Sequence, residues 1–217
     1  IQTNVHATEK VLSCAGRNKK RVVLASTSEV YGRAGSPVFR ESDDLLIGPP
    51  THSRWAYAAS KALDEYLALA YQKEGKIETT IVRFFNTVGP RQTGRYGMVL
   101  PRFVGRALQN DPLQVYGTGE QSRCFCHVAD TVEALIALEN AAGTDGEIVN
   151  IGSTESVTIN QLAERVKALL DSSSEIQHIP YQEAYEPGFE DMPRRMPAID
   201  KIQELTQWQP KRELDLI

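Results

Sequence analysis

The stretch Val22-Val-Leu-Ala-Ser-Thr-Ser-Glu-Val-Tyr-Gly32 decides the fold. It begins as a continuous apolar run, which is typical of a strand buried on both faces of a parallel sheet. The run ends in hydroxyl groups, the carboxylate of Glu29 and the turn residue Gly32. Because open α/β sheets carry their active sites at the carboxyl ends of the strands, we expect a site at this point of the chain.

Helices and strands alternate along the rest of the chain. This alternation is typical of a doubly wound parallel sheet, so the predicted fold class is α/β. We expect Thr158 to cap the helix that follows it. The pattern predicts helices over residues 2–16, 54–74, 98–109, 130–142, 158–170 and 198–206, and strands over residues 21–26, 78–85, 113–116, 123–127 and 147–151.

Tyr57 and Lys61 form a candidate acid–base pair in the stretch Trp55-Ala-Tyr-Ala-Ala-Ser-Lys61. The two residues are four positions apart in a predicted helix, so their side chains share one face. A phenol normally loses its proton near pH 10. Because a nearby ammonium favours the phenolate, we expect Tyr57 to act as a base close to neutral pH.

These two segments, in this order, resemble the extended short-chain dehydrogenase/reductase family of nucleotide-sugar epimerases, dehydratases and decarboxylases. The resemblance extends from Asn4 to about Pro210. Further similar segments are Arg83-Phe-Phe-Asn-Thr-Val-Gly-Pro-Arg91, Pro112-Leu-Gln-Val-Tyr-Gly117, Ser122-Arg-Cys-Phe-Cys-His-Val-Ala-Asp130 and Gly146-Glu-Ile-Val-Asn-Ile-Gly152.

The resemblance implies two units and an NAD cofactor. Residues 1–90 and 128–152 would form the C-terminal part of a Rossmann-type NAD-binding domain. Residues 91–127 and 153–217 would form a small nucleotide-sugar-binding subdomain. No glycine-rich fingerprint follows a strand, and Gly117-Thr-Gly119 lies in a predicted turn. We therefore expect a fragment of a longer enzyme that binds NAD poorly alone.

The resemblance also implies four catalytic residues. Thr27 would hydrogen-bond the 4-oxygen of the sugar, although a strand-end hydroxyl also caps turns. Glu29 would move a proton at C5, with a solvated turn residue as the equally weighted alternative. Tyr57 would take the proton of the 4-hydroxyl, assisted by Lys61.

Further positions match residues that hold the cofactor and the substrate. The residues on the cofactor side are Asn4, Tyr57, Lys61 and Phe85. The alternative for Asn4 is a simple polar helix residue, and the alternative for Phe85 is a core residue. An arginine suits phosphate because its planar fork binds oxygen atoms in pairs. On the substrate side the residues are Asn86, Tyr116, Arg123 and Arg195.

The reaction branch stays open between two chemistries on a UDP-sugar. Ser26-Thr-Ser-Glu29, Arg123-Cys-Phe and Gly188-Phe-Glu-Asp-Met-Pro-Arg-Arg-Met-Pro197 resemble UDP-glucuronate decarboxylases, which we slightly favour. Tyr57-Ala-Ala-Ser-Lys61 resembles UDP-hexose 4-epimerases equally well. Ser28 stands where 4,6-dehydratases usually have an acid, which disfavours dehydration. The rival hypothesis is a truncated, inactive sugar-nucleotide-binding module.

The composition of the chain disfavours several classes of partner and location. The formal net charge of −4 disfavours a general nucleic-acid binder, and no apolar run is long enough for a membrane helix. Three cysteines do not make a disulfide framework, and the polar residues 1–20 do not form a secretory signal, so we expect a cytoplasmic protein. Cys124, Cys126 and His127 lack a second ligand cluster, so we expect no metal site.

The resemblance implies a homodimer through a four-helix bundle. The matching helices are residues 2–16 and 54–74. The second helix carries an apolar stripe at helical spacing, with packing of that stripe on the sheet as the alternative. The stripe consists of Leu63, Tyr66, Leu67 and Ala70.

Overall fold

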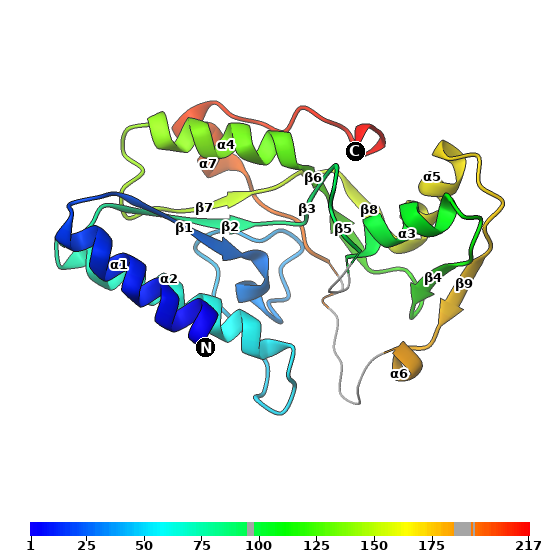
Figure 1. Ribbon diagram of the computed structural model, residues 1–217, viewed down its shortest axis with the longest axis horizontal. Helices are drawn as coiled ribbons and strands as arrows, with labels where there is room; N and C mark the ends of the chain where they lie inside the picture. Colours follow the sequence, from blue (N-terminus) through cyan, green and yellow to red (C-terminus); the bar gives the residue numbers. More distant parts are fainter. Residues whose placement is uncertain (95–97, 185–191, 193) are drawn as a thin grey trace.

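The centre of the fold is a parallel sheet of three strands (Figure 1). The computed structural model describes residues 1–94, 98–184, 192 and 194–217. The strands are β1 (Val22–Thr27), β2 (Thr79–Phe84) and β7 (Ile148–Ile151), in the order β1-β2-β7. The expected α/β class with a parallel sheet is confirmed.

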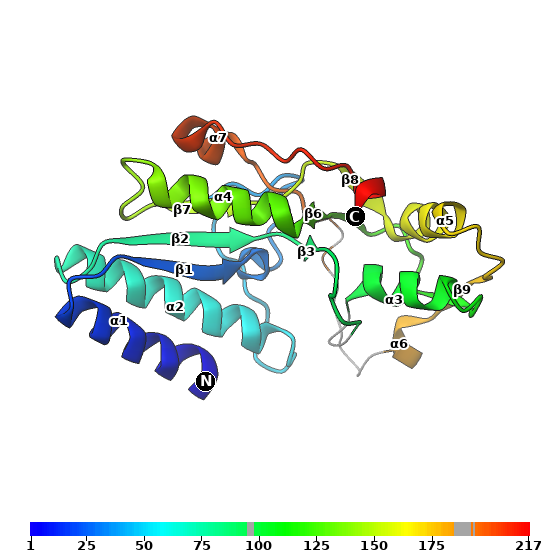
Figure 2. The same ribbon diagram turned by 45° about the horizontal axis from the view of Figure 1, so that its top comes forward.

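Helices cover both faces of this sheet (Figures 1 and 2). On one face lie α1 (Ala7–Arg17) and α2 (Trp55–Lys73), and on the other lie α4 (Val128–Asn140) and α7 (Asp200–Thr206). Residues 2–6 of the first predicted helix form a π-helical turn, η1 (Gln2–His6). Each face has its own apolar core, which is the arrangement that buries both sides of a parallel sheet.

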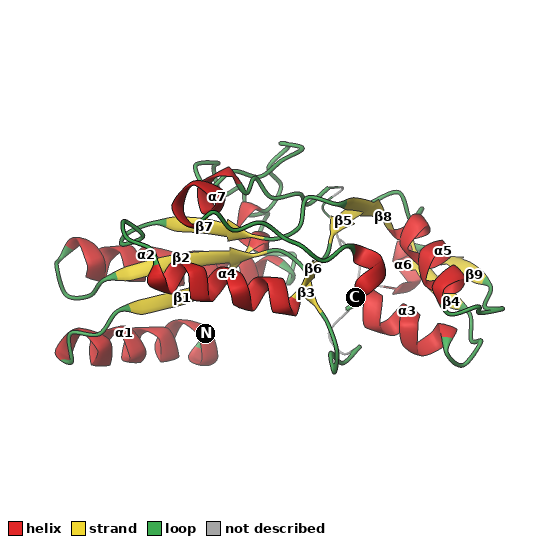
Figure 3. Ribbon diagram, turned by 90° about the horizontal axis from the view of Figure 1, so that it is seen from above, coloured by secondary structure: helices red, strands yellow, loops and turns green. Residues whose placement is uncertain are grey.

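A second, smaller unit packs beside the carboxyl ends of the strands (Figure 3). It contains α3 (Val99–Ala107), α5 (Ile159–Leu169) and α6 (Tyr181–Ala184). Its strands pair as β4 (Leu113–Tyr116) with β9 (Ile176–Ile179), and as β5 (Ser122–Cys124) with β8 (Ser156–Thr158). Thr158 caps α5 in a full capping box with Gln161, as predicted from the sequence.

Several short strands and turns were not predicted from the sequence pattern. The predicted strand 123–127 is two strands, because Phe125 separates β5 from β6 (Cys126–His127). β6 pairs with β3 (Thr87–Val88), which continues the chain beyond β2. The described residues also form the 3₁₀ turns η2 (Ser28–Tyr31) and η4 (Leu214–Leu216).

The end of the chain does not belong entirely to the smaller unit. Ile199, Ile202 and Trp208 pack with Val82 and Val149 in the core under α4. Residues near 199–208 therefore pack on the sheet rather than on the smaller unit to which the sequence assigned them. The spacing of the apolar residues in this segment does not predict the contact, because a short amphipathic helix can pack on the core of the sheet or on that of the smaller unit.

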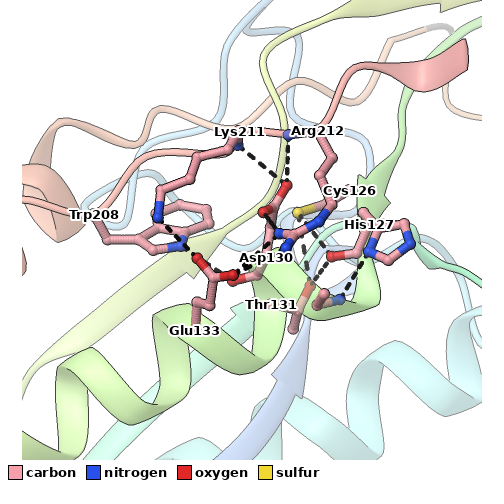
Figure 4. Close-up of polar contacts among 9 residues, drawn as sticks. Cys126, His127, Asp130, Thr131, Glu133, Trp208, Lys211 and Arg212 are labelled. Atoms are coloured by element: carbon pink, nitrogen blue, oxygen red, sulfur yellow. Dashed lines mark hydrogen bonds and ion pairs between the residues drawn. The ribbon is translucent and has the colours of Figure 1, made fainter. Parts of the chain in front are cut away.

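A buried carboxylate fixes this segment to α4 (Figure 4). Asp130 is fully buried, accepts hydrogen bonds from the backbone N–H groups of Lys211 and Arg212, and forms an ion pair with the Arg212 guanidinium. The indole N–H of Trp208 donates to the Asp130 carbonyl at 3.1 Å. The cluster thus ties the end of the chain to α4 on one face of the sheet.

Candidate active site

The turn after β1 presents Glu29 at the carboxyl end of the sheet. The Thr27 hydroxyl accepts a hydrogen bond from the Glu29 backbone N–H at 3.3 Å and caps η2. Gly32 ends the turn at φ +61°, where an added Cβ would meet the Leu46 carbonyl oxygen at 2.3 Å. Only glycine fits there, so the strand–turn sequence fixes the direction in which Glu29 leaves the sheet.

Buried aromatic and charged groups support this turn from below. Tyr31 stacks on Phe39 with ring centroids 4.7 Å apart, and the Arg83 guanidinium lies 4.7 Å from the centre of the Tyr31 ring. The Tyr31 hydroxyl donates to the Asn150 side-chain oxygen at 2.7 Å. Burial raises the pKa of Tyr31 to about 12, so this phenol stays neutral and structural.

Glu29 is an ionised carboxylate surrounded by arginines. Its two oxygens pair with Arg195 and, at 3.2 Å, with Arg54. Burial alone would raise the pKa of Glu29, but the positive charges of Arg195, Arg54 and Arg123 together bring it below the ordinary value. The structure thus brings together three of the predicted residues, Glu29, Arg123 and Arg195, although they are far apart in the sequence.

Tyr57 lies over this carboxylate from the start of α2. Its side chain is half-exposed and lines the same cavity as Thr27 and Glu29. Partial burial raises the pKa of the Tyr57 phenol, and the negative charge of Glu29 raises it further. The expectation that Lys61 lowers this pKa is therefore wrong for the structure as it stands.

Lys61 forms an ion pair on its own helix. Its ammonium lies 2.7 Å from a carboxylate oxygen of Asp64, three residues further along α2. Asn4 is also engaged on this helix, where its amide donates to the Ser60 hydroxyl at 2.8 Å. Ser60 in turn donates to the Tyr57 carbonyl, so Asn4 braces the turn of α2 that carries Tyr57.

The two residues that follow β2 have different environments. The Phe85 ring is fully buried with Tyr31 and Phe39, and its contact with the cofactor stays a prediction. Its neighbour Phe84 points into the cavity instead. Asn86 also borders the cavity, and its amide donates to the Cys124 carbonyl at 3.0 Å.

A cavity of about 790 Å³ lies between the sheet and the smaller unit. It joins the catalytic candidates at the end of β1 to the substrate candidates on β4 and β5. Tyr116 lies at the far side, where its ring stacks with Arg102 and its hydroxyl accepts from that guanidinium at 2.6 Å. The predicted residues that line the cavity are Thr27, Glu29, Tyr57, Asn86, Tyr116, Arg123 and Arg195.

Comparison with known proteins defines the family. Residues 1–152 match the model of the family described as "NAD dependent epimerase/dehydratase family". The chain belongs to this family. The match covers β1, α2, β2 and β7, and therefore includes the elements that carry Thr27, Glu29 and Tyr57.

Curated relatives of the chain are decarboxylases of nucleotide-linked sugar acids. The chain is 46% identical over 211 residues to a UDP-N-acetyl-alpha-D-glucosaminuronate decarboxylase of Bacillus cytotoxicus, covering 97% of this chain and 65% of that protein. It is 37% identical over 224 residues to UDP-glucuronic acid decarboxylase 3 of Arabidopsis thaliana, covering 99% and 60%. The chain thus spans less than two thirds of the length of these relatives.

Solved structures share the fold. A UDP-glucuronic acid 4-epimerase of Bacillus cereus, in complex with UDP-glucuronic acid and NAD, aligns with a TM-score of 0.84 and 26% identity, over 98% of this chain and 63% of that one. A dTDP-glucose 4,6-dehydratase of Bacillus anthracis, in complex with NAD, aligns with a TM-score of 0.85 and 28% identity, over 99% and 65%. Epimerase, dehydratase and decarboxylase chemistry therefore all occur on this fold.

Three arginines of the cavity were not singled out from the sequence. Arg54 is the N-cap of α2, three residues before Tyr57, a spacing that places both side chains near one another. Arg102 and Arg106 are four residues apart on α3 and both line the cavity. Their helical spacing was a usable signal, but nothing in the sequence shows that α3 turns this face to the sheet.

Cys124 and Cys126 are buried in the core, whereas Cys14 is exposed. Burial raises the pKa of the Cys124 thiol to about 12 and that of Cys126 to about 11, so neither is a ready thiolate ligand. His127 caps α4 by accepting from the Ala129 backbone N–H at 3.0 Å. In the described part of the chain, no group of three or more potential ligands gathers to hold a metal ion.

Proposed function

We propose that the protein is an NAD-dependent enzyme that decarboxylates a UDP-linked hexuronic acid, UDP-glucuronate, through a 4-keto intermediate. One observation carries this proposal: Glu29, held by Arg54 and Arg195, lines the same arginine-rich cavity as Tyr57. A UDP-hexuronate carries a diphosphate and a carboxylate, and such a cavity attracts anions.

The chain's own residues suit the proton steps of this reaction. Thr27 would hold the 4-oxygen of the sugar while Tyr57 takes the proton of the 4-hydroxyl. A 4-keto hexuronate is a β-keto acid, so its C5–carboxylate bond breaks to give carbon dioxide and an enolate. The enolate then takes a proton at C5, where Glu29 and its arginine partners would position the sugar acid and manage that proton.

Part of an NAD site fits the residues present. The half-exposed Tyr57 faces the cavity at the end of β1, and Lys61 lies one turn further along α2. These two residues would hold the reacting end of NAD, which when bound supplies the oxidation at C4 and its reversal. Asn4 would contribute indirectly, through Ser60 and the backbone of Tyr57.

The substrate test must distinguish two sugar acids. The Bacillus cytotoxicus relative is named for UDP-N-acetyl-alpha-D-glucosaminuronate and the Arabidopsis relative for UDP-glucuronic acid, and both names imply a carboxylate at C5. We expect the native gene product, supplied with NAD, to release carbon dioxide from UDP-glucuronate. Release from UDP-N-acetylglucosaminuronate alone would move the proposal to that substrate.

A 4-epimerase is the second candidate function, supported by the structural likeness to the Bacillus cereus UDP-glucuronic acid 4-epimerase. In that case the keto sugar keeps its carboxylate and returns with the opposite configuration at C4. Interconversion of UDP-glucose and UDP-galactose, or of UDP-glucuronate and UDP-galacturonate, without carbon dioxide would establish it. UDP-sugar binding with no conversion of any of these substrates would support the inactive module.

The assembly and the surroundings of the protein are proposed on separate grounds. We infer a homodimer through the α1–α2 layer, because Val11, Leu63 and Tyr66 are exposed there. The described residues contain no helix that is long and apolar enough to cross a membrane. A cytoplasmic location and the lack of a nucleic-acid partner remain predictions from cysteine use and net charge.

A further inference from the structure

Asp64 is a buried charge that the proposed chemistry does not use. Its side chain is fully buried in α2, and one carboxylate oxygen, Oδ2, accepts from the Lys61 ammonium at 2.7 Å. The other oxygen, Oδ1, is buried with no hydrogen-bond partner among the described residues. Burying an ionised group in this way costs stability unless something else requires the charge.

The next residue shows what a structural carboxylate looks like on this helix. Glu65 is also buried, and both of its oxygens are satisfied: Oε1 accepts from Ser26 and Arg83, and Oε2 accepts from Arg83 at 2.7 Å. Asp64 has one partner where Glu65 has a full set. A buried polar atom left unsatisfied in this way needs a reason other than stability.

The position of Lys61 supplies that reason. Lys61 and Tyr57 share one face of α2, yet the ammonium is paired with Asp64 instead of lowering the pKa of the phenol. We propose that Asp64 is a positioning residue that holds Lys61 away from Tyr57 until a ligand draws the ammonium back to the phenol. This inference rests on the proposed acid–base role of Tyr57.

Other charges also act on the phenol and must be separated from this effect. Glu29 from η2 and Asp64 from α2 raise the pKa of Tyr57, whereas Arg195, from the segment before α7, lowers it. Replacing Asp64 removes its direct repulsion and also frees the Lys61 ammonium. Only the second effect requires Lys61, so a pair of variants can distinguish them.

The test is an NMR titration of the ligand-free 217-residue chain labelled at tyrosine Cζ. The Tyr57 signal is assigned by its loss in Tyr57→Phe. Asp64→Asn keeps the shape of the side chain and removes the charge that holds the Lys61 ammonium. We expect this variant to lower the pKa of Tyr57 by about 1 unit, the lower end of what a nearby opposite charge does. The buried Tyr31, with a pKa of about 12, serves as the internal reference.

The control repeats the exchange in a Lys61→Met chain. If Asp64 acts through Lys61, Asp64→Asn should then shift the pKa of Tyr57 by less than half as much. An equal shift in both backgrounds, or no downward shift with Lys61 present, overturns the proposal. Asp64→Glu, which keeps the charge, should leave the pKa of Tyr57 near that of the parent.

Folding and function are monitored separately. Circular dichroism first checks each variant, and Asp64→Ser replaces Asp64→Asn if the amide does not fold. The titration requires neither NAD nor substrate, so it stands if the protein proves to have another activity. A failed decarboxylation assay together with the expected titration would reject the proposed reaction and keep the role of Asp64.

Discussion

At the scale of single residues, Glu29 distinguishes the two proposed reactions. A 4-epimerase needs no group acting at C5, whereas a decarboxylase must position the sugar acid and supply a proton there. We therefore expect Glu29→Gln to abolish most carbon dioxide release but to leave epimerisation nearly intact. The measurement is the product distribution from UDP-glucuronate with the native gene product.

A matched exchange controls for the loss of an ion-paired carboxylate. Glu133 lies on α4, outside the cavity, and forms ion pairs with Lys211 and Arg212. Glu133→Gln should leave turnover unchanged. If Glu29→Gln leaves carbon dioxide release at the parent rate, the proposed role of Glu29 is wrong.

Tyr57→Phe tests the acid–base group itself. The exchange removes the hydroxyl next to Thr27 and keeps the ring, so turnover should fall by roughly 10²–10⁴-fold while substrate binding is largely kept. Single-turnover kinetics and UDP-sugar titration measure the two effects. Tyr66→Phe is the control, because Tyr66 is an exposed tyrosine on the same helix and lies outside the cavity. A variant at position 57 with parent turnover would remove Tyr57 from the mechanism.

The sequence predicted most residues of the site but not their pairing. Thr27, Glu29 and Tyr57 could be predicted because a strand end and a helix start fix where they lie. The pairing of Lys61 with Asp64 could not be predicted. On a helix a lysine reaches the residue three positions ahead, here Asp64, as easily as the residue four positions back, here Tyr57. The burial of the Phe85 ring was not predictable either, because neighbouring strand residues point to opposite faces and only the packing decides which face is the core.

At the scale of elements, α2 is tied to the sheet by one buried ion pair. Glu65 and Arg83 are both almost fully buried and are joined by two hydrogen bonds, at 3.0 and 2.7 Å. Removing one partner leaves the other charge buried and unpaired, so Glu65→Ala should lower the free energy of unfolding by about 3–5 kcal/mol. Chemical denaturation measures the change.

The exposed pair between Arg40 and Asp200 is the comparison. Its side chains are 60% and 64% exposed, so Asp200→Ala should cost about 0–1 kcal/mol. Equal losses from the two exchanges would show that burial of the Glu65–Arg83 pair adds nothing. In that case the orientation of α2 would depend on its apolar contacts alone.

The outer face of α2 bears on the proposed dimer. Leu63 and Tyr66 are 46% and 65% exposed, whereas Leu67 packs partly against the core around Leu12 and Ile81. Leu67 thus follows the packing alternative for the apolar stripe, and the bundle through Leu63 and Tyr66 stays a prediction. Leu63→Glu should give a folded monomer, and Leu67→Glu should mainly lower the melting temperature. Light scattering and thermal unfolding of each variant check this, and a chain that is monomeric before any exchange would contradict the bundle.

At the scale of the whole molecule, alternation of strands and helices was enough to predict the sheet and the helices that cover it. The short strands β3, β8 and β9 were not predictable, because they have two to four residues and depend on partners distant in the sequence. The placement of α7 on the sheet depends on Trp208 and the buried Asp130, whose contact no local pattern announces.

β1 is an edge strand of the sheet in the described chain. Within the described chain β1 pairs with β2 alone, and Val23 on this edge strand is 37% exposed. A hollow of about 400 Å³ beside it is lined mainly by apolar side chains from β1, β2 and α4. The dinucleotide phosphates of NAD are best held by a glycine-rich turn and a helix N-terminus, and the sequence contains no such turn after a strand.

We therefore expect the isolated 217-residue chain to bind NAD weakly and to show no turnover. UDP is the positive control, because its phosphates would bind in the cavity with Arg102, Arg123 and Arg195, which the chain does contain. Calorimetry with both ligands should give a measurable heat for UDP and little for NAD. Tight NAD binding would show that the residues around Tyr57 hold the cofactor without a glycine-rich turn, whereas binding of neither ligand would indicate that the cavity does not form in the isolated chain.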